Sequence, residues 1–181
     1  MLPLPRLRLL GAFAAVCVVS ACNPTFNWRE YRSADAGYRV LFPGKPSSMT
    51  RTIELAGAKL DMTLTAAEVD EVNFAVGSAE VADATKAQAA LDAMKTTLVN
   101  NIRATIKRES ASSSASASGG AARRNSAIEI EALGARQGVP VLLVGRFIAR
   151  DKRIYQVIVM GKEQRVSPEN VDTFLSSFKL E

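Results

Sequence analysis

Apolar and polar residues alternate with a period of two through the first part of the folded chain. Within residues 59–67, Leu60, Met62 and Leu64 fall on one face, while Asp61 and Thr63 fall on the other. Successive side chains of a β-strand point to opposite faces, so this pattern predicts strands half buried in a sheet. Short turns between the segments favour an antiparallel meander. The predicted strands cover residues 26–32, 38–42, 49–55, 59–67 and 72–81.

The period changes near residue 83. Ala87, Leu91, Met94, Leu98 and Ile102 recur at spacings of three and four, which predicts a long helix over residues 83–108 with one buried face. We interpret this apolar stripe as part of the core.

A Ser-, Ala- and Gly-rich segment follows at residues 109–125. It has almost no large apolar side chains, so burial cannot offset the entropy of ordering it. We therefore predict a flexible surface loop within one domain. A role as a lid or a docking loop is the alternative.

Period-two patterns return in the last third, predicting strands at residues 128–132, 139–149 and 153–160. Residues 150–152 form the turn of a tight hairpin between the last two. Their apolar runs at 141–144 and 157–160 are nearly continuous, which is typical of central strands covered on both faces. We expect the two helices to cover them.

The chain ends in a short amphipathic helix. Ser167 is in the N-cap position, Pro168 in the first helical position, and Glu169 adds negative charge to the first turn. The apolar positions of this helix are Val171, Phe174, Leu175 and Phe178. The predicted fold class is α+β: an antiparallel sheet of about seven to eight strands, with one long and one short C-terminal helix packed on it.

Residues 1–21 have the parts of an export signal. Arg6 and Arg8 precede an apolar run of eleven residues, 9–19, and small residues follow. A bilayer core roughly 30 Å thick needs about 20 helical residues, so this run is too short to span it. We predict that the segment is cleaved.

The cleavage region, Val19-Ser20-Ala21-Cys22, resembles the bacterial lipobox. The resemblance implies that the Cys22 thiol receives a diacylglycerol, that cleavage follows Ala21, and that the freed amine is acylated, commonly with palmitate. A plain secretory signal with a stray thiol is the alternative. Asn23, not an aspartate, follows Cys22, which favours the outer membrane facing the periplasm. We expect a lipidated tether at residues 22–25 and one domain over 26–181.

Composition narrows the chemistry. Cleavage would leave 160 of the 181 residues, which is enough for one domain with a sizeable core. Cys17 would leave with the signal, Cys22 would be used for lipid, and the chain has no histidine. These facts argue against histidine-based triads, Cys/His zinc sites and thiol nucleophiles. We therefore predict no cofactor, no metal and no catalytic residue.

The charge of the predicted mature chain is mildly basic. Without Arg6 and Arg8 it has 21 Lys and Arg against 18 Asp and Glu, a net charge of +3. We interpret this as solubility with some affinity for anionic surfaces, and we expect no nucleic acid partner.

Acidic side chains are the first candidates for chemistry. Glu129 and Glu131 share a strand face and are candidates for acid/base catalysis or cation binding. The simpler interpretation is that they lie on a solvated face of the strand. Glu68, Asp70 and Glu71 offer a loose calcium site, although the spacing of an EF-hand loop is absent.

Basic residues cluster around the last hairpin, and Arg146, Arg150, Lys152 and Arg153 form a candidate patch for an anionic partner. The alternative is that these charges solvate a very apolar hairpin and protect it from aggregation.

Two segments carry a family resemblance. Val40-Leu41-Phe42-Pro43-Gly44-Lys45-Pro46 resembles the F-P-G-x-P segment of bacterial envelope proteins in the PsbP/Mog-like superfamily. Arg153-Ile154-Tyr155-Gln156-Val157 followed by the segment from Phe174 to Leu180 is also similar to that superfamily. The resemblance implies an antiparallel sheet with helices on its faces and a mostly non-catalytic role in binding or assembly. It offers no functional residue to transfer.

We therefore expect a non-catalytic, lipid-anchored envelope protein that binds or helps assemble an envelope protein partner. A lipid- or small-ligand-binding module, using space between the long helix and the sheet, is the alternative. An enzyme based on carboxylates is the least favoured.

Overall fold

The computed structural model describes the backbone of residues 25–118 and 121–181, and the side chains of these residues except 114–118 and 121–124. The strands are β1 (Arg29–Ser33), β2 (Tyr38–Phe42), β3 (Ser47–Leu55), β4 (Ala58–Val69), β5 (Val72–Glu80), β6 (Thr105–Ser118), β7 (Ala121–Arg136), β8 (Val139–Arg150), β9 (Arg153–Lys162) and β10 (Lys179–Leu180). The helices are α1 (Ala87–Asn101) and α2 (Pro168–Ser177), with 3-10 turns η1 (Ala84–Lys86) and η2 (Glu163–Arg165).

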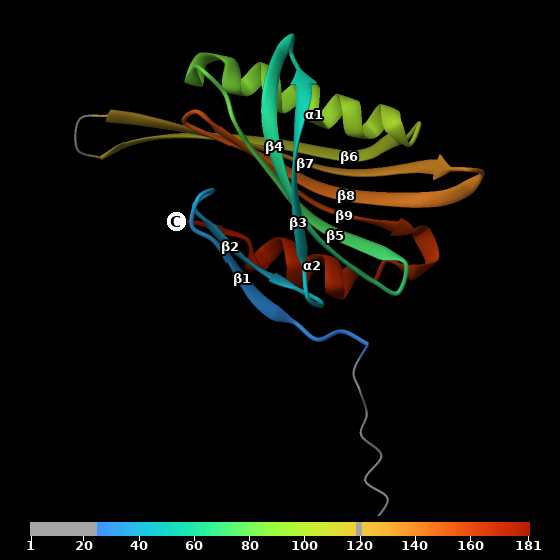
Figure 1. The fold of residues 1–181 in the computed structure, drawn as a ribbon. Helices are drawn as coiled ribbons and strands as arrows, with labels where there is room; N and C mark the ends of the chain where they lie inside the picture. Colours follow the sequence, from blue (N-terminus) through green and yellow to red (C-terminus); the bar gives the residue numbers. More distant parts are fainter. Residues whose placement is uncertain (1–24, 119–120) are drawn as a thin grey trace, which may run out of the picture.

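The strands form two antiparallel sheets. The large sheet has seven strands in the order β3-β4-β5-β9-β8-β7-β6, and the small sheet has the order β1-β2-β10. Helix α1 covers one face of the large sheet, while α2 and the small sheet lie on the other face (Figure 1). The α+β class predicted from the sequence is confirmed, with the strands divided between two sheets.

Apolar side chains on both faces of β9 explain this layering. Ile154 and Ile158 belong to the core on the α1 side, which also contains Leu91 and Met94 of α1. Val157 belongs to the core on the α2 side. Because both faces of this strand are buried, the sheet needs a cover on each side. The prediction that the two helices cover the last two long strands is confirmed.

Helix α2 follows its sequence pattern closely. It begins after Ser167 with Pro168 at the first position, and the side chains of Phe174 and Phe178 are buried in the α2-side core. Ser167 makes no side-chain capping bond, but its carbonyl accepts from the Val171 amide at 3.0 Å.

The first helix is shorter than predicted. It ends at Asn101, and the segment 105–108, expected to be helical, is the start of β6. Arg103 has φ +49° and reverses the chain. Gly134 of β7 allows this helix end to approach, because a Cβ there would lie 2.4 Å from the Ile102 carbonyl oxygen. The Ala135 amide donates to the same oxygen at 2.9 Å.

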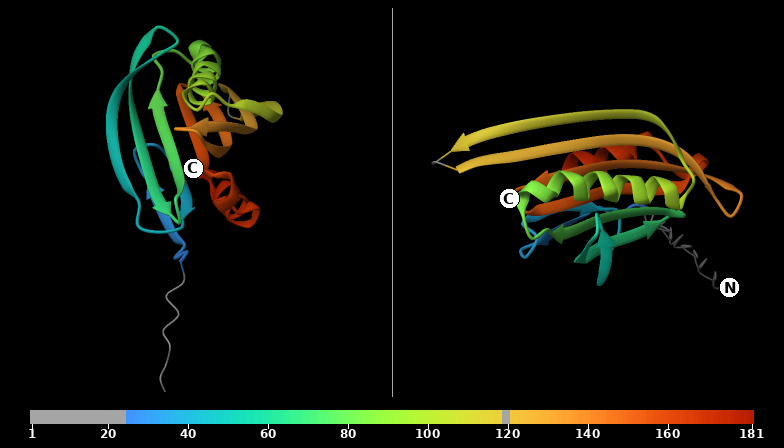
Figure 2. Two further views of the ribbon diagram at one scale, coloured as in Figure 1. Left: turned by 90° about the vertical axis from the view of Figure 1, so that its right-hand side faces the viewer. Right: turned by 90° about the horizontal axis from the view of Figure 1, so that it is seen from above.

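The flexible loop predicted at 109–125 is also wrong for the part that the structure describes. Residues 109–118 continue β6 and residues 121–125 begin β7, with Ser110 opposite Glu129 and Ser118 opposite Ala121. Backbone hydrogen bonds to β7, itself paired with β8 as far as Asn125, extend this ribbon without large side chains. The ribbon projects past the rest of the large sheet (Figure 2). Residues 119–120 lie outside the described residues.

Among the described residues, no helix combines the length and apolar character that a bilayer crossing requires.

Replacing Phe174 with Ala tests the α2-side core. The ring is fully buried, and its centroid lies 5.4 Å from those of Phe42 and Phe74. We expect the free energy of unfolding to fall by about 3–5 kcal/mol, because the change removes buried area and leaves a cavity. Urea denaturation measures it. Asp172→Ala, an exposed change on the same helix, is the control, and equal effects of the two variants would contradict this assignment.

Candidate functional site

The turn between β1 and β2 lies against the large sheet and borders two adjoining pockets. The first, of about 490 Å³, includes Arg150, Lys152 and Arg153 in its lining and is called the basic pocket here. The second, of about 410 Å³, includes Ser48 and Thr50 and is called the hydroxyl pocket. Asp35, Ala36, Glu80 and Arg153 line both pockets.

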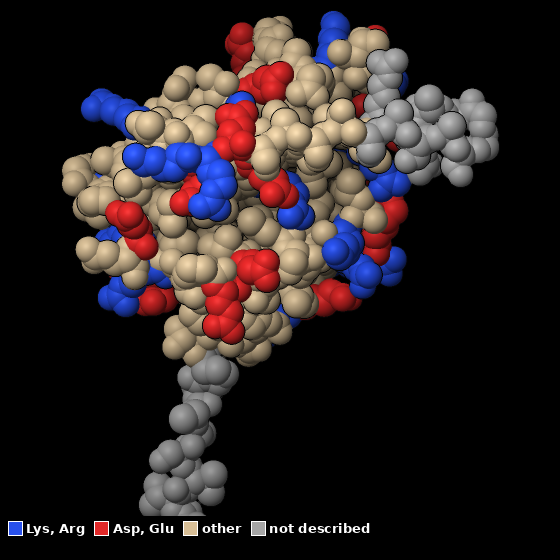
Figure 3. All heavy atoms as spheres, turned by 180° about the vertical axis from the view of Figure 1, so that it is seen from behind, with Lys and Arg blue, Asp and Glu red and all other residues tan. Residues whose placement is uncertain are grey.

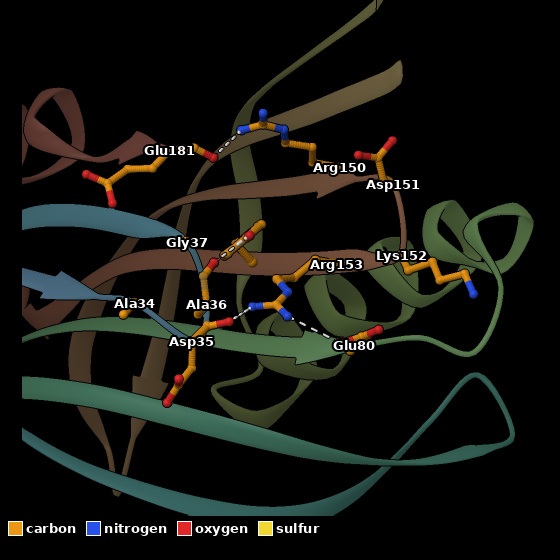
Figure 4. Close-up of a pocket in the computed structure, with 11 residues that line it drawn as sticks. Ala34, Asp35, Ala36, Gly37, Glu80, Arg150, Asp151, Lys152, Arg153 and Glu181 are labelled. Atoms are coloured by element: carbon orange, nitrogen blue, oxygen red, sulfur yellow. Dashed lines mark hydrogen bonds and ion pairs between the residues drawn. The ribbon is translucent and has the colours of Figure 1, made fainter. Parts of the chain in front are cut away.

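Arg153 joins the small sheet to the large one. One guanidinium nitrogen donates to the Asp35 carbonyl oxygen, and another lies 3.3 Å from a Glu80 carboxylate oxygen. Figure 4 shows the guanidinium between these two partners, with Lys152 extending away from the Asp35 carbonyl. The guanidinium of Arg153 is therefore largely engaged by groups of the protein itself.

The structure brings together three of the four residues of the predicted anionic-partner patch. Arg150 donates to the Glu181 carbonyl oxygen at 3.3 Å, and Lys152 has no ion pair among the described residues. Arg146 is absent from the lining of the basic pocket. Its side chain lies 2.7 Å from a Glu129 oxygen and donates to the Leu175 carbonyl oxygen of α2 at 3.2 Å.

Charge around the basic pocket is compensated. Acidic residues in its lining include Asp35, Glu80 and Asp151. On the face seen in Figure 3, Lys and Arg are interspersed with Asp and Glu. The mixed charge of this lining supports solvation of the hairpin more than a dedicated anion site.

The hydroxyl pocket is built on paired residues of β3 and β4. Ser48 and Thr65 hydroxyls lie 2.8 Å apart, and Thr50 and Thr63 hydroxyls 2.9 Å apart. Further along, the Thr52 hydroxyl donates to an Asp61 carboxylate oxygen at 2.6 Å. These pairs share a face because the register places them directly opposite each other.

Other elements complete this pocket. Tyr31 of β1 brings its hydroxyl to 3.5 Å from that of Ser48. Asp35 comes from the β1–β2 turn and Glu80 from the end of β5. With Asp61, three carboxylates line the pocket, and all three residues are exposed.

A buried tyrosine ties the turn to β9. The Tyr155 hydroxyl donates to the Ala36 carbonyl oxygen at 2.8 Å. Burial raises the pKa of Tyr155 above its usual value, and burial likewise raises the pKa of Tyr38 on β2. Both rings contact Phe178 of the C-terminal segment.

The basic pocket and the hydroxyl pocket together are called the cleft here. The acidic residues singled out from the sequence, described next, lie outside this cleft. Glu129 pairs with Arg146 at 2.7 Å, and Glu131 lies 3.4 Å from Arg108. At the β4–β5 turn a hydrogen bond from Lys162 holds the pKa of Glu71 below its usual value. Within residues 25–118 and 121–181, no group of three or more Asp or Glu side chains is arranged to hold a metal ion.

Sequence reasoning missed the hydroxyl pocket. The Ser and Thr residues that face each other on β3 and β4 were a sequence signal that could have predicted one wall of this pocket. The contributions of Tyr31 and Asp35 depend on the docking of the small sheet, which no local pattern reveals. The predicted lipidation residue Cys22 and the motif Val19-Ser20-Ala21 lie outside the described residues.

Comparisons with known proteins show similarity of fold alone. No protein-family model matches the chain, and no curated protein matches its sequence. The solution structure of cyanobacterial PsbP (CyanoP) from Synechocystis is similar at 16% identity and a TM-score of 0.49, covering 95% of this chain and 99% of that one. A Pseudomonas aeruginosa protein of unknown function is similar at 12% identity and a TM-score of 0.32, covering 76% and 85%. Membership of the PsbP/Mog-like superfamily stays a prediction.

Replacing Arg153 with Met tests the link between the sheets. We expect the free energy of unfolding to fall by about 0.5–1.5 kcal/mol, because the Asp35 carbonyl and Glu80 both lose a partner. Lys152→Met, on the same hairpin, is the matched control and should change stability little. Thermal unfolding followed by circular dichroism measures both, and a control as destabilised as Arg153→Met would contradict the link.

Stability should also fall at high pH. Below about pH 10 both folded and unfolded chains keep the protons of Tyr38 and Tyr155. Above it the unfolded chain loses them first, because burial raises both pKa values in the fold. Stability therefore decreases as pH rises. We expect the urea midpoint to drop between about pH 9 and pH 11, and to drop less steeply in Tyr155→Phe. Equal slopes would argue against the buried environment of Tyr155.

Proposed function

We propose that this chain is a lipid-anchored protein of the bacterial cell envelope whose folded domain binds, or helps assemble, an envelope protein partner without catalysing a reaction. The single observation that carries the binding role is the cleft at the β1–β2 turn. Hydroxyls and charged groups from separate strands meet there at the surface.

The composition of the cleft suits recognition. Arg153 and Arg150 are paired with groups of the fold, so they hold the β1–β2 turn in place. Asp35, Asp61 and Glu80 are exposed and stay in water. A catalytic acid at neutral pH generally needs burial or a like charge to raise its pKa. Exposed carboxylates beside hydroxyls are better suited to hydrogen bonding with the polar groups of a partner.

The lipobox supports the anchor. Only two residues, Asn23 and Pro24, separate Cys22 from the first described residue, Thr25. The three steps from Cys22 to Thr25 span at most about 11 Å, so a lipid on Cys22 would keep the domain near the bilayer. The described chain begins beside β1, on the side of α2 and the small sheet and away from α1 (Figure 1). We infer that this side is nearer the membrane, and Asn23 favours the periplasmic face of the outer membrane.

The lipid-binding alternative gains no support from the described residues. Leu91 and Met94 of α1 pack with Leu143 and Phe147 in one buried cluster, which occupies the space that this alternative needs. A carboxylate enzyme would use Asp35, Asp61 and Glu80, whose exposure argues against it.

Replacing Cys22 with Ala tests the anchor. In a bacterial host, wild type should incorporate radiolabelled palmitate and fractionate with membranes, while Cys22→Ala should lose both. Cys17→Ala is the matched control, because Cys17 is predicted to leave with the signal. It should behave as wild type. Palmitate on Cys22→Ala, or loss of label in Cys17→Ala, would refute the lipobox assignment.

Crosslinking in the same strains tests partner binding. We expect a defined envelope protein to be captured by the anchored wild type and much less by Cys22→Ala. Turnover of a substrate by the purified protein, abolished by a single cleft substitution, would contradict the non-catalytic proposal.

A further inference from the structure

The outer edge of β3 is open. In the large sheet this strand pairs with β4 alone, and it ends the strand order on that side. Residues 47–52 are all exposed. No backbone hydrogen bond joins this edge to another described segment. Its free amide and carbonyl groups form a template for another strand.

Residues 47–52 of this edge carry little of the usual protection against strand pairing. Between residues 47 and 52 the only charged side chain is Arg51, and there is no proline. The opposite edge of the sheet, β6, has Lys107, Arg108 and Glu109 near its start and a register shift between Ile106 and Arg108. Charges and irregular register hinder strand pairing at this end of β6, and residues 47–52 of β3 have no such irregularity.

The hydroxyl pocket adjoins the open edge. Ser48 and Thr50 of β3 line it, and Asp61 lies behind them on β4. Ser78, also in the lining, is only 8% exposed. On the other face of the edge Met49 is 48% exposed and offers an apolar contact.

The charge of this pocket is one-sided. Its lining contains three carboxylates and one cation, Arg153, which is engaged with Glu80 and the Asp35 carbonyl. Asp61 has a hydrogen bond from Thr52 but no ion pair among the described residues. A cationic group would therefore complement the pocket.

We propose that an extended segment of a partner polypeptide adds to β3 as an extra strand and places a Lys or Arg side chain in the hydroxyl pocket. Neighbouring strands lie about 4.8 Å apart, so the added strand would lie about 10 Å from β4. Of the basic and polar side chains, Lys and Arg have the length to approach Asp61 across β3. Backbone pairing supplies affinity and the pocket supplies specificity. This inference rests on the proposed role in binding a protein partner.

The test uses the full lipidated protein, purified from membranes in a mild detergent. The probe is a capped nine-residue peptide of alternating Thr and Val with a central Lys and a terminal benzophenone. A second peptide has Glu in the centre. Isothermal titration calorimetry measures affinity, and photo-crosslinking followed by mass spectrometry maps contacts. Asp61→Lys reverses the pocket charge, Asp61→Asn keeps a hydrogen-bond acceptor, and Asp92→Lys makes the same charge change on the exposed face of α1.

We expect the Lys peptide to bind at least about tenfold more tightly than the Glu peptide and to crosslink to residues 47–52. Asp61→Lys should remove this preference, Asp61→Asn should reduce it, and Asp92→Lys should leave it intact. Asp61→Asn keeps the test valid if Asp61→Lys fails to fold.

Equal affinity for the two peptides, crosslinks outside β3, or an Asp92→Lys effect as large as that of Asp61→Lys would overturn the proposal. A dimer that crosslinks β3 to β3 and excludes the peptide would assign the edge to a second copy and overturn it too. If the peptide fails to bind while the anchored protein still captures a partner in cells through other residues, the docking surface is wrong and the proposed function stands.

Discussion

Side chains of β9 are buried on both faces of the large sheet. Ile154 and Ile158 face the α1 side, and Val157 and Val159 face the α2 side. Burying an aliphatic side chain of this size stabilises a fold by about 1.5–3 kcal/mol, so leaving either face in water would be costly. One long helix covers the first face. The second face needs α2 and the small sheet together, and that joint cover creates the features on which the functional proposals depend.

The cleft lies where the second cover ends. The β1–β2 turn extends past the aromatic contacts of Tyr38 and Phe42 and reaches the ends of β5 and β9. Polar links replace apolar packing there, through the Tyr155 hydroxyl and the Arg153 guanidinium. The same docking leaves residues 47–52 of β3 exposed, which is why a polar pocket and an open edge adjoin.

The sequence predicted those elements whose pattern is local and whose burial is periodic. The strand at 38–42 matches β2, and the apolar stripe of the last helix lies in the α2-side core. The start of β6 was missed because Ile102 and Ile106 also continue the helical spacing of α1. Where the helix ends, the Ile102 carbonyl oxygen lies against Gly134 and accepts from the Ala135 amide, and both contacts are distant in sequence. The Ser/Ala ribbon was missed because its order comes from pairing with β7.

The candidate site was less predictable than the fold. Arg146 and Arg150 share a strand face in the sequence pattern. In the structure they have different partners, because Arg146 donates to the Leu175 carbonyl oxygen of α2 and Arg150 to that of Glu181. The carboxylates of the hydroxyl pocket come from a turn and two strands that are far apart in sequence. The β4–β5 register places Asp61 beside Glu80, and the docking of the small sheet adds Asp35, which no single-sequence pattern encodes.

Native-state hydrogen exchange tests the central claim, that a doubly covered β9 organises the fold, most directly. Exchange rates rank segments by the free energy of their opening. We expect the slowest amides in β5 and β9, and intermediate rates shared by β1 and β2, which would open together as a removable cover. Among those strands of the large sheet that contact α1 or α2, we expect β3 to have the fastest amide exchange. Protection of β1 and β2 equal to that of β9, or of β3 above that of β5, would contradict the account.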